Sequence, residues 1–583
     1  MTAPTRAPEL HGAGWIGVDR PLSLREDLGG KVVVLDFWTF CCVNCLRALE
    51  ELRPIERRFA DELVVIGVHS PKFPHEHDHE AVRQAVARLH INHPVLDDPE
   101  LETWNRYGVR AWPTLVVIDP EGYVVAMGSG EGLGPAIERL VEQLISDHEA
   151  QGSLRPGAVI AGDPPEGAPL DRPLAFPGKV ASDGGERLAI ADTAHDRVLV
   201  TDRLGLVMQV LDGLLEPQGV RFDWTTSASR QPEDFLLICE TGADRLIRVE
   251  LSSGAREVVL DGLASPWDVL VEKGGTYLIA EAGRHRLWRC TRDGSDAVPV
   301  AGGTAEGLRD GPGADAHLAQ PSGLAGLDDG AVFVDAESSA LRVLSDDGAV
   351  ATLVGVGLFE WGASDGPPEV ARLQHPLGVA TPPPSGPAGR DFVVYVADTF
   401  NSRLRVWRDG ELHTLAIPGL NEPGGLDVLP DGRLLVADTN NHRIVSIDPR
   451  TGTFAAIPVR GLSDARHFSG SVDDPGPPSD VEEGPPFRVP PGTRFSVPFF
   501  VDVAGEPLDP SSGPPVRVML DSEPASLLAG PANWGFHEAV GTAEVIAGEP
   551  GSGTLTVEVV AATCEEKVCR VHRRLVRHRL KVG

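Results

Sequence analysis

The sequence predicts a multidomain protein with an N-terminal α/β domain, a six-bladed all-β propeller and a small C-terminal β-sandwich. Residues 1–150 alternate apolar strand-like runs with helical periodicity, the middle of the chain repeats one hairpin pattern six times, and the end shows strand patterns only. The length of 583 residues also exceeds what a single hydrophobic core normally supports. Several separately packed domains are therefore expected.

Shifts in composition give the boundaries of these domains. Residues 151–173 are rich in Gly and Pro, and residues 463–491 are rich in Pro, Gly and Asp, so both stretches are expected to be linkers. The α/β domain is therefore assigned to residues 1–150, the propeller to residues 174–462 and the β-sandwich to residues 492–583.

The α/β domain begins with a strand that leads into a helix. Residues 31–37 (KVVVLDF) form a short β-branched run, which predicts a buried strand. Pro54 should kink the helix that follows, whose apolar face consists of Leu46, Leu49, Leu52, Ile55 and Phe59. The order β-α-β-α-β-β-α is completed by strands over residues 64–68, 115–118 and 123–127 and by helices over residues 80–89 and 134–146.

Three of the seven cysteines, Cys41, Cys42 and Cys45, lie at the junction between this strand and this helix. Unpaired N–H groups and the positive end of the helix dipole favour a thiolate there, and two cysteines separated by two residues can close a small disulfide. This pattern predicts a redox dithiol with Cys42 as the nucleophile and Cys45 as the resolving thiol. A zinc knuckle, which lacks a second ligand pair here, and inert core cysteines are the alternatives.

With Trp112 and Pro113 just before the third strand, these residues resemble the thioredoxin-like fold of the peroxiredoxin and TlpA-like kind. The resemblance implies that Trp112-Pro113 forms the cis-proline loop beside the dithiol, and that Asp36 is the buried acid that assists proton transfer at the resolving thiol. Cys41 replaces the usual tryptophan and remains an accessory thiol. Because adjacent cysteines bridge poorly, the pairing of Cys42 with Cys45 is favoured.

A histidine-rich segment, residues 75–79 (HEHDH), follows the second strand, with His69, His90 and His93 nearby. Its alternating polar pattern is typical of a solvated loop, which we prefer over a metal site. We therefore expect no metal, and no cofactor is implied.

The excess of acidic residues excludes several classes of partner. Fifty-two Lys and Arg residues against 85 Asp and Glu residues give a formal net charge of −33, which opposes binding to nucleic acid or anionic lipid. Residues 1–20 have no apolar signal-like core, and no stretch is apolar enough to span a bilayer. We expect a soluble cytoplasmic protein, whose reducing environment agrees with few cysteines and a catalytic Cys-X-X-Cys pair.

Each of the six repeats in the middle of the chain is an apolar strand that ends in an acid, a polar turn and a second strand. Intervals of 40 to 63 residues between the acids indicate propeller blades. The acids are Asp192, Glu240, Glu281, Asp335, Asp398 and Asp438. Five residues later comes an arginine in every copy except the fourth, which has Ala340, so we expect an ion pair that locks each hairpin rather than a catalytic site.

The repeat resembles the NHL family, whose propellers usually present a surface to protein, peptide or nucleic acid. Given the acidic charge, the expected partner is a protein or peptide and not nucleic acid. Loops inserted in the longer intervals, around residues 359–361 and 382–390, are candidates for functional contacts.

The C-terminal residues alternate at strand lengths, which predicts the antiparallel β-sandwich. Cys564 and Cys569 flank a short polar turn between two strand-like runs, so a hairpin should bring their β-carbons within bridging distance. The pair also resembles cysteines of immunoglobulin-like domains that exchange disulfides with a thioredoxin-like partner. A reversible Cys564–Cys569 disulfide is our hypothesis, and a chance juxtaposition of two strand cysteines is the alternative.

The order of the three domains resembles the NHL repeat-containing protein 2-like family. That resemblance implies a cytoplasmic thiol–disulfide oxidoreductase or thiol redox sensor coupled to a protein-binding propeller. The alternative is a non-catalytic interaction scaffold in which the thioredoxin-like domain is vestigial.

Overall fold

The computed structural model describes residues 5–157, 172–226, 232–303, 305–382, 392–469, 482–483, 486–500, 516–529, 533–536, 540–565 and 568–583. Most of the two expected linkers and of the loop at residues 382–390 lies outside the described residues. No helix of the described part is both long and apolar enough to cross a membrane.

The N-terminal domain is built on one mixed sheet with the strand order β1-β7-β6-β3-β4-β5-β2. Strands β3, β4 and β5 are parallel, and β6 runs antiparallel to β3. The strands are β1 Thr5–Arg6, β2 Gly14–Ile16, β3 Val32–Trp38, β4 Leu63–His69, β5 Val95–Asp97, β6 Thr114–Ile118 and β7 Tyr123–Ser129. Every residue of β3 and β4 is buried, because helices cover the sheet on both faces.

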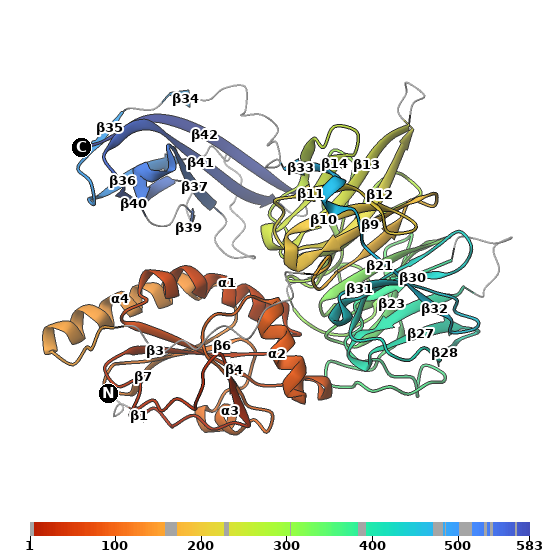
Figure 1. The fold of residues 1–583 in the computed structure, drawn as a ribbon, viewed down its shortest axis with the longest axis horizontal. Helices are drawn as coiled ribbons and strands as arrows, with labels where there is room; N and C mark the ends of the chain where they lie inside the picture. The colour runs from red at the N-terminus through yellow and green to blue at the C-terminus, as the bar shows by residue number, and fades with distance from the viewer. Residues whose placement is uncertain are drawn as a thin grey trace. The chain divides into compact units, whose positions relative to one another are not determined.

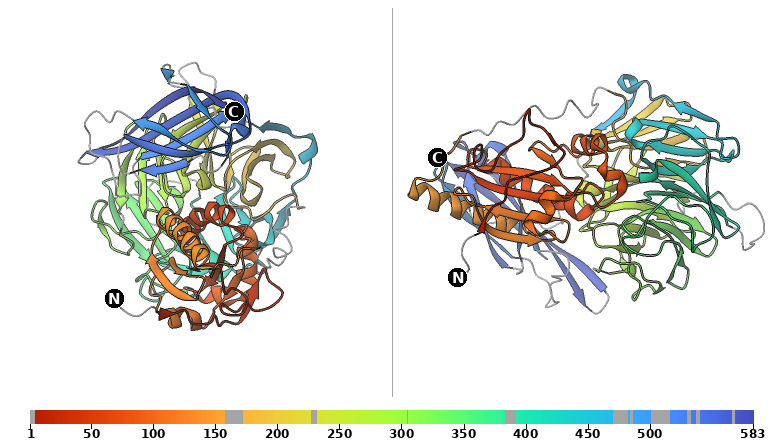
Figure 2. Two further views of the ribbon diagram at one scale, coloured as in Figure 1. Left: turned by 90° about the vertical axis from the view of Figure 1, so that its left-hand side faces the viewer. Right: turned by 90° about the horizontal axis from the view of Figure 1, so that it is seen from below.

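Helices α1 and α4 lie side by side on one face of this sheet, and α3 lies on the other (Figures 1 and 2). Arg58 of α1 forms ion pairs with Glu138 and Glu142 of α4. The helices are α1 Val43–Arg58, α2 His79–Arg88, α3 Glu102–Tyr107 and α4 Gly134–Gln151, with a short 3₁₀ turn, η1 Pro74–His77. All the elements expected from the sequence are present. The additional elements are β1, β2, β5, α3 and η1, and α4 runs five residues beyond its expected end.

The next part of the chain, here called the repeat region (described residues 172–226, 232–303, 305–382 and 392–469), forms six sheets of four or five strands among the described residues (Figure 1). In chain order the sheets are β33-β11-β10-β9-β8, β12-β13-β14-β15, β16-β17-β18-β19, β20-β24-β23-β22-β21, β25-β26-β27-β28 and β29-β30-β31-β32. Each of the six predicted hairpins forms the middle of one sheet.

The strands of the first three repeat sheets are β8 Val180–Ser182, β9 Arg187–Asp192, β10 Arg197–Asp202, β11 Val207–Asp212, β12 Pro217–Thr226, β13 Pro232–Glu240, β14 Arg245–Glu250, β15 Arg256–Leu260, β16 Pro266–Val271, β17 Tyr277–Glu281, β18 Arg286–Cys290 and β19 Val298–Gly302. Those of the last three are β20 Gly311–Pro312, β21 Pro321–Leu327, β22 Gly330–Asp335, β23 Ala340–Ser345, β24 Ala349–Val354, β25 Gly378–Ala380, β26 Val394–Asp398, β27 Arg403–Arg408, β28 Glu411–Thr414, β29 Pro423–Val428, β30 Leu434–Asp438 and β31 Arg443–Ile447, followed by β32 Phe454–Ile457 and, in the first sheet, β33 Arg466–Ser469.

The first and the last repeat sheets contact one another. The Ser182 amide donates to Asp427 at 2.7 Å, and Thr439 Oγ1 donates to the Pro177 carbonyl at 2.8 Å. Strand β33 lies at the edge of the first sheet, where it pairs in parallel with β11. Segments from the two ends of the repeat region are therefore hydrogen-bonded to each other.

The expected ion pairs form in three hairpins and differ in the other three. Asp192, Glu240 and Asp438 each bind the arginine five residues on, at 2.7 Å. In the remaining copies the partners are Arg284 for Glu281, Arg342 for Asp335 and Arg405 for Asp398. The predicted pairing with the arginine five residues on is thus wrong for the third and fifth copies. In the fourth copy, for which the sequence offered Ala340 at that position, Arg342 supplies the partner.

The same six acids accept a backbone N–H from a turn that precedes each sheet. The donors are the amides of Ala175, Leu215, Ala264, Ala319, Gln374 and Asn421, at 2.7 to 3.0 Å. The next residue in each turn lies before a proline and has a positive φ; these residues are Phe176, Glu216, Ser265, Gln320, His375 and Glu422. Non-glycine residues rarely adopt this conformation, and it recurs at functional sites.

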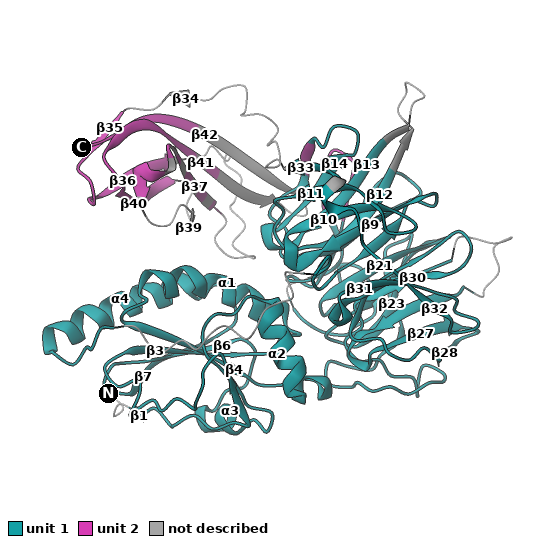
Figure 3. Ribbon diagram, viewed as in Figure 1, with its two compact units in different colours: residues 1–255, 259–288, 299–471 teal, residues 256–258, 289–298, 472–583 magenta. Residues whose placement is uncertain are grey.

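The chain divides into two compact units, residues 1–255, 259–288 and 299–471 in one and residues 256–258, 289–298 and 472–583 in the other (Figure 3). The N-terminal domain and nearly all of the repeat region belong to the first unit.

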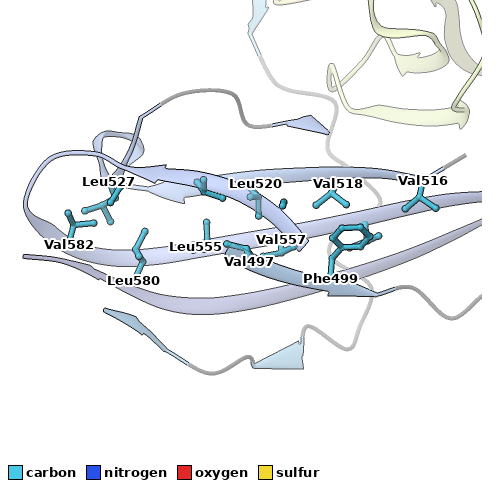
Figure 4. Packing of buried hydrophobic residues seen from close by; sticks show 14 residues of the cluster. Val497, Phe499, Val516, Val518, Leu520, Leu527, Leu555, Val557, Leu580 and Val582 are labelled. Atoms are coloured by element: carbon cyan, nitrogen blue, oxygen red, sulfur yellow. The ribbon is translucent and has the colours of Figure 1, made fainter. Parts of the chain in front are cut away.

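The second unit contains two sheets whose buried side chains form one hydrophobic cluster (Figure 4). One sheet has the order β34-β42-β41-β37-β39, with β35 also paired to β42, and the other has the order β36-β40-β38. The strands are β34 Glu482–Glu483, β35 Phe487–Val489, β36 Arg494–Phe500, β37 Val516–Glu523, β38 Leu528–Ala529, β39 Asn533–Phe536, β40 Val540–Ala547, β41 Gly551–Glu565 and β42 Val568–Val582. Two sheets around one core are what the expected β-sandwich requires.

Candidate dithiol site

The strand-to-helix junction places the dithiol as the sequence predicts. Strand β3 ends at Trp38, and Cys42 is the N-cap residue of α1, in an extended conformation. Cys42 is half-buried, whereas Cys41 and Cys45 are buried. The Cys42 carbonyl accepts the amide of Cys45 at 3.0 Å, so the two residues share the first turn of the helix. An accessible thiol followed by a buried one is the arrangement that an attacking and a resolving cysteine need.

Cys45 and Asp36 form a buried acidic pair beneath Cys42. Burial raises the pKa of the Cys45 thiol, and a hydrogen bond with Cys42 and the nearby charge of Asp36 raise it further. Burial also raises the pKa of Asp36 to about 8, because neither carboxyl oxygen has a hydrogen-bond partner among the described residues. Asp36 is therefore protonated at neutral pH, and it titrates in the range where thiols exchange protons.

The loop before β6 packs against this site. The Trp112-Pro113 peptide bond is cis, as the resemblance implies. Trp112 packs against the cluster that contains Cys41 and Cys45, and its indole N–H donates to the Ser70 carbonyl at 2.8 Å. Trp112 also contacts Trp104 of α3, with ring centroids 4.4 Å apart.

Gln320 is a residue of this site that sequence reasoning missed. Its side-chain oxygen accepts the amide of Val43 at 3.1 Å, and its side-chain nitrogen donates to the Cys41 carbonyl at 3.0 Å. Gln320 is thereby bonded to the backbone on both sides of Cys42, although it lies in the repeat region, 277 residues away from Val43. Gln320 is one of the six residues that have a positive φ and precede a proline. The proline after it is the signal that the sequence offers.

Further contacts join the repeat region to the N-terminal domain around the dithiol. Arg47 of α1 binds Asp244 at 2.8 Å, and Arg88 of α2 binds Glu422 at 3.2 Å. Lys72 binds Glu337 through a short hydrogen bond.

Aromatic side chains pack across the same boundary. The Phe73 ring lies 4.9 Å from the ring of Trp361, which belongs to one of the loops that the sequence singled out. Phe40 lies 5.5 Å from Phe400. One side of the dithiol is thus covered by the repeat region.

The histidine-rich segment is solvated only in part: His77, Asp78 and His79 are exposed, as the sequence predicts, whereas His75 is half-buried and Glu76 is buried. Glu76 is fully buried, and its carboxylate accepts the amide of Cys41 at 3.1 Å and the hydroxyl of Thr39. His75 binds Glu422 at 2.7 Å, which raises the pKa of His75 against the opposing effect of burial. His79 instead binds Asp97, at 2.7 Å. These side chains serve different carboxylates rather than one common centre.

Cys41, Cys42, Cys45, Asp36, Trp112 and Pro113 therefore lie at one site. Cys564 and Cys569 lie in the second compact unit, directly opposite one another in the antiparallel register of β41 and β42. The predicted hairpin is confirmed.

A Cys-X-X-Cys dithiol on this fold, followed by repeated β-sheets, defines a thioredoxin-like protein with an appended NHL repeat region. The Thioredoxin-like family model matches residues 29–124, and the NHL repeat model matches residues 420–445. The chain belongs to the NHL repeat-containing protein 2 family. It is 33% identical over 533 residues to "NHL repeat-containing protein 2" of Gallus gallus, covering 79% of this chain and 72% of that protein.

Two other similarities concern the separate parts of the chain. The thiol–disulfide oxidoreductase YkuV of Bacillus subtilis (strain 168) is 22% identical over 143 residues, covering 24% of this chain and 95% of that protein. A streptogramin B lyase structure covers 51% of this chain and 88% of its own, with 12% identity and a TM-score of 0.35. The N-terminal domain is thus homologous to thiol–disulfide oxidoreductases.

Proposed function

We propose that this protein is a cytoplasmic thiol–disulfide oxidoreductase or thiol redox sensor, and that its repeat region is a closed six-bladed propeller that binds a protein or peptide. One observation carries the redox function, the difference in burial at the dithiol. Cys42 is half-buried at the start of the helix, whereas Cys45 and Asp36 are buried. Hydrogen bonds between the first and last repeat sheets support a closed propeller.

In the proposed reaction a disulfide substrate is reduced by the dithiol. The Cys42 thiolate attacks one substrate sulfur, so that a Cys42–substrate bond forms while the substrate disulfide breaks and one substrate thiolate leaves to take up a proton. In the fraction of molecules in which Asp36 is ionised, Cys45 transfers its proton to the Asp36 carboxylate and attacks Cys42 Sγ. The Cys42–Cys45 disulfide forms, the Cys42–substrate bond breaks, and the second substrate thiolate leaves and takes up a proton. The substrate gains the two electrons that the dithiol loses, and an external dithiol reductant regenerates the enzyme.

The contact with Gln320 favours a second function, an interaction scaffold. The amide of Val43 has no acceptor within α1, because it lies at the N-terminus of the helix. The side-chain oxygen of Gln320 accepts its hydrogen bond instead. Burial of the dithiol loop against the repeat region would restrict a large substrate. In this alternative the thioredoxin-like domain is a platform, and binding rather than chemistry is the function.

Rates of alkylation distinguish the two functions. We expect Cys42 to react with iodoacetamide faster than every other cysteine at pH 7, because it is accessible and begins a helix. Mass spectrometry of the reduced full chain after short exposures gives the rate for each cysteine. Fully buried Cys239 is the internal control. Reaction of Cys42 no faster than Cys239 would support the scaffold.

The opposed positions of Cys564 and Cys569 give a second expectation. Directly paired residues on antiparallel strands have Cα atoms about 4.5 to 5.5 Å apart, which a disulfide can span. Peroxide treatment of the full chain is expected to form Cys564–Cys569, and a thiol reductant is expected to clear it through Cys42. Peptide mapping follows the bond over time. If a Cys42→Ser variant clears the bond as fast as the unmodified protein, transfer through Cys42 is wrong.

A further inference from the structure

Three buried side chains of ligand type converge beside the dithiol. Cys41 comes from the loop before α1, Glu337 from the turn between β22 and β23, and His375 from a turn before β25. One ligand atom of each, the Cys41 sulfur, a carboxylate oxygen and an imidazole nitrogen, lies within 4.8 Å of the other two. Cys41 precedes Glu337 and His375 by roughly 300 residues in the sequence, so only the fold brings the three together.

Two of these side chains have buried polar atoms without a partner. Oε1 of Glu337 and Nδ1 of His375 are enclosed and have no hydrogen-bond partner among the described residues. Leaving a polar atom unpaired in the interior is costly, so such atoms normally have a partner. Both atoms belong to side chains that converge with the Cys41 sulfur, which indicates that a ligand absent from the protein chain satisfies them.

Neighbouring residues hold the two side chains in position. Lys72 binds Oε2 of Glu337, whereas Oε1 has no hydrogen-bond partner among the described residues. The His375 ring stacks on Phe400 at 4.4 Å and contacts Phe73 at 5.3 Å, so its plane is fixed. Partners of this kind orient the ligands in established metal sites.

The local charge also favours a cation. The ammonium group of Lys72 is paired with the carboxylates of Glu306 and Glu337, and a third carboxylate, that of Glu76, lies beside Cys41. Glu76 is bonded to the amide of Cys41, and Glu306 lies 3.5 Å from Lys72. The excess of negative charge in a buried place is costly unless a positive ion offsets it.

We propose that Cys41, Glu337 and His375 form a binding site for a divalent cation of the zinc class, located between the thioredoxin-like domain and the repeat region. A thiolate, an imidazole and a carboxylate are the donors that zinc prefers, and three protein ligands leave a fourth position for water. Binding releases the Cys41 proton to solvent. Because the ligands come from both parts, the ion joins them.

The test must separate this site from the dithiol, because any cysteine thiolate is a ligand for zinc. Full-length protein carrying Cys42→Ser and Cys45→Ser is stripped with a chelator and titrated with zinc sulfate against a competing indicator. One equivalent is expected to bind. Adding Cys41→Ser, Glu337→Gln or His375→Gln is expected to weaken binding at least about tenfold, the loss seen even when outer partners are removed. Cys239→Ser and His413→Gln, remote from the cluster, are the matched controls.

A second measurement does not require the three ligand variants to fold. X-ray absorption at the zinc edge of the Cys42→Ser, Cys45→Ser protein is expected to show one sulfur at about 2.3 Å together with nitrogen or oxygen ligands at about 2.0 to 2.2 Å. Absence of sulfur from the shell overturns the proposal. So does loss of all zinc binding in the Cys42→Ser, Cys45→Ser protein, or unchanged affinity in the three ligand variants.

Discussion

Replacing Asp36 with asparagine is expected to stabilise the thioredoxin-like domain at pH 8 by up to about 5 kcal/mol and to have little effect near pH 4. The pKa of Asp36 is raised from 3.8 to about 8 by burial. Between these values the folded protein holds a proton that the unfolded chain has lost, so stability falls as the pH rises through this window. Each pKa unit corresponds to about 1.4 kcal/mol, and asparagine removes the penalty because it does not ionise.

Hydrogen exchange of the amides of β3 in the full chain, measured from pH 5 to pH 8, reports the stability of this domain without requiring two-state unfolding. In the unmodified protein the stability of the domain should fall as the pH rises, and in the variant this fall should be absent. Exposed Asp147, at the far end of the domain in α4, provides the control Asp147→Asn. Formation of the Cys42–Cys45 disulfide should also slow in Asp36→Asn, because Cys45 loses its proton acceptor. An unchanged slope would show that Asp36 is already ionised at neutral pH.

Replacing Arg405 with alanine is expected to destabilise the repeat region by about 3 to 5 kcal/mol, the typical cost of leaving one partner of a buried ion pair unpaired. Arg405 and Asp398 are both 0% exposed, and their side chains lie 2.7 Å apart. Arg405 also donates to the carbonyls of Arg372 and Ser364. The variant would therefore leave the buried charge of Asp398 without its ion-pair partner and would remove a donor from two carbonyls.

Arg403→Ala is the matched control, two residues away on the same strand and exposed. Its effect is expected to stay within about 0.5 kcal/mol, as is usual at the surface. Urea denaturation of both variants, read through the midpoint and slope, compares the two costs. Dithiol alkylation should be unchanged in both, because the pair is structural. If the two variants were destabilised equally, Arg403 would contribute as much as Arg405, and the result would support the five-residue pairing that the sequence predicts.

The sequence could not distinguish Arg403 from Arg405 because both lie on the same face of β27, two residues apart. What decides between them is a second carboxylate. Asp365 lies in the longest interval between repeats, and it binds Arg405 at 2.6 Å. Asp310, in the next longest interval, binds Arg342 at 3.1 Å in the same manner. Inserted loops thus redirect the ion pair, and no periodicity within the hairpin reveals them.

Local features of the dithiol were predictable, whereas contacts from the repeat region were not. Cys42, Cys45 and Asp36 follow from one strand and one helix, since a buried run and a helix start are visible in the sequence. Gln320 and His375 depend on how turns of the repeat region meet the thioredoxin-like domain. Both precede a proline, which marks their backbone but not their partner.

The pairing of β33 with β11 affects how this protein is synthesised. Strands β8 to β11 leave the ribosome early, but the strand that completes their sheet is made roughly 250 residues later. Until then the outer edge of β11 presents unpaired N–H and C=O groups, which are a template for association with other chains. Contacts so distant along the sequence also form slowly. A nascent chain of this protein therefore carries an aggregation-prone edge through most of the translation of its repeats, and chaperone demand should be highest in that interval.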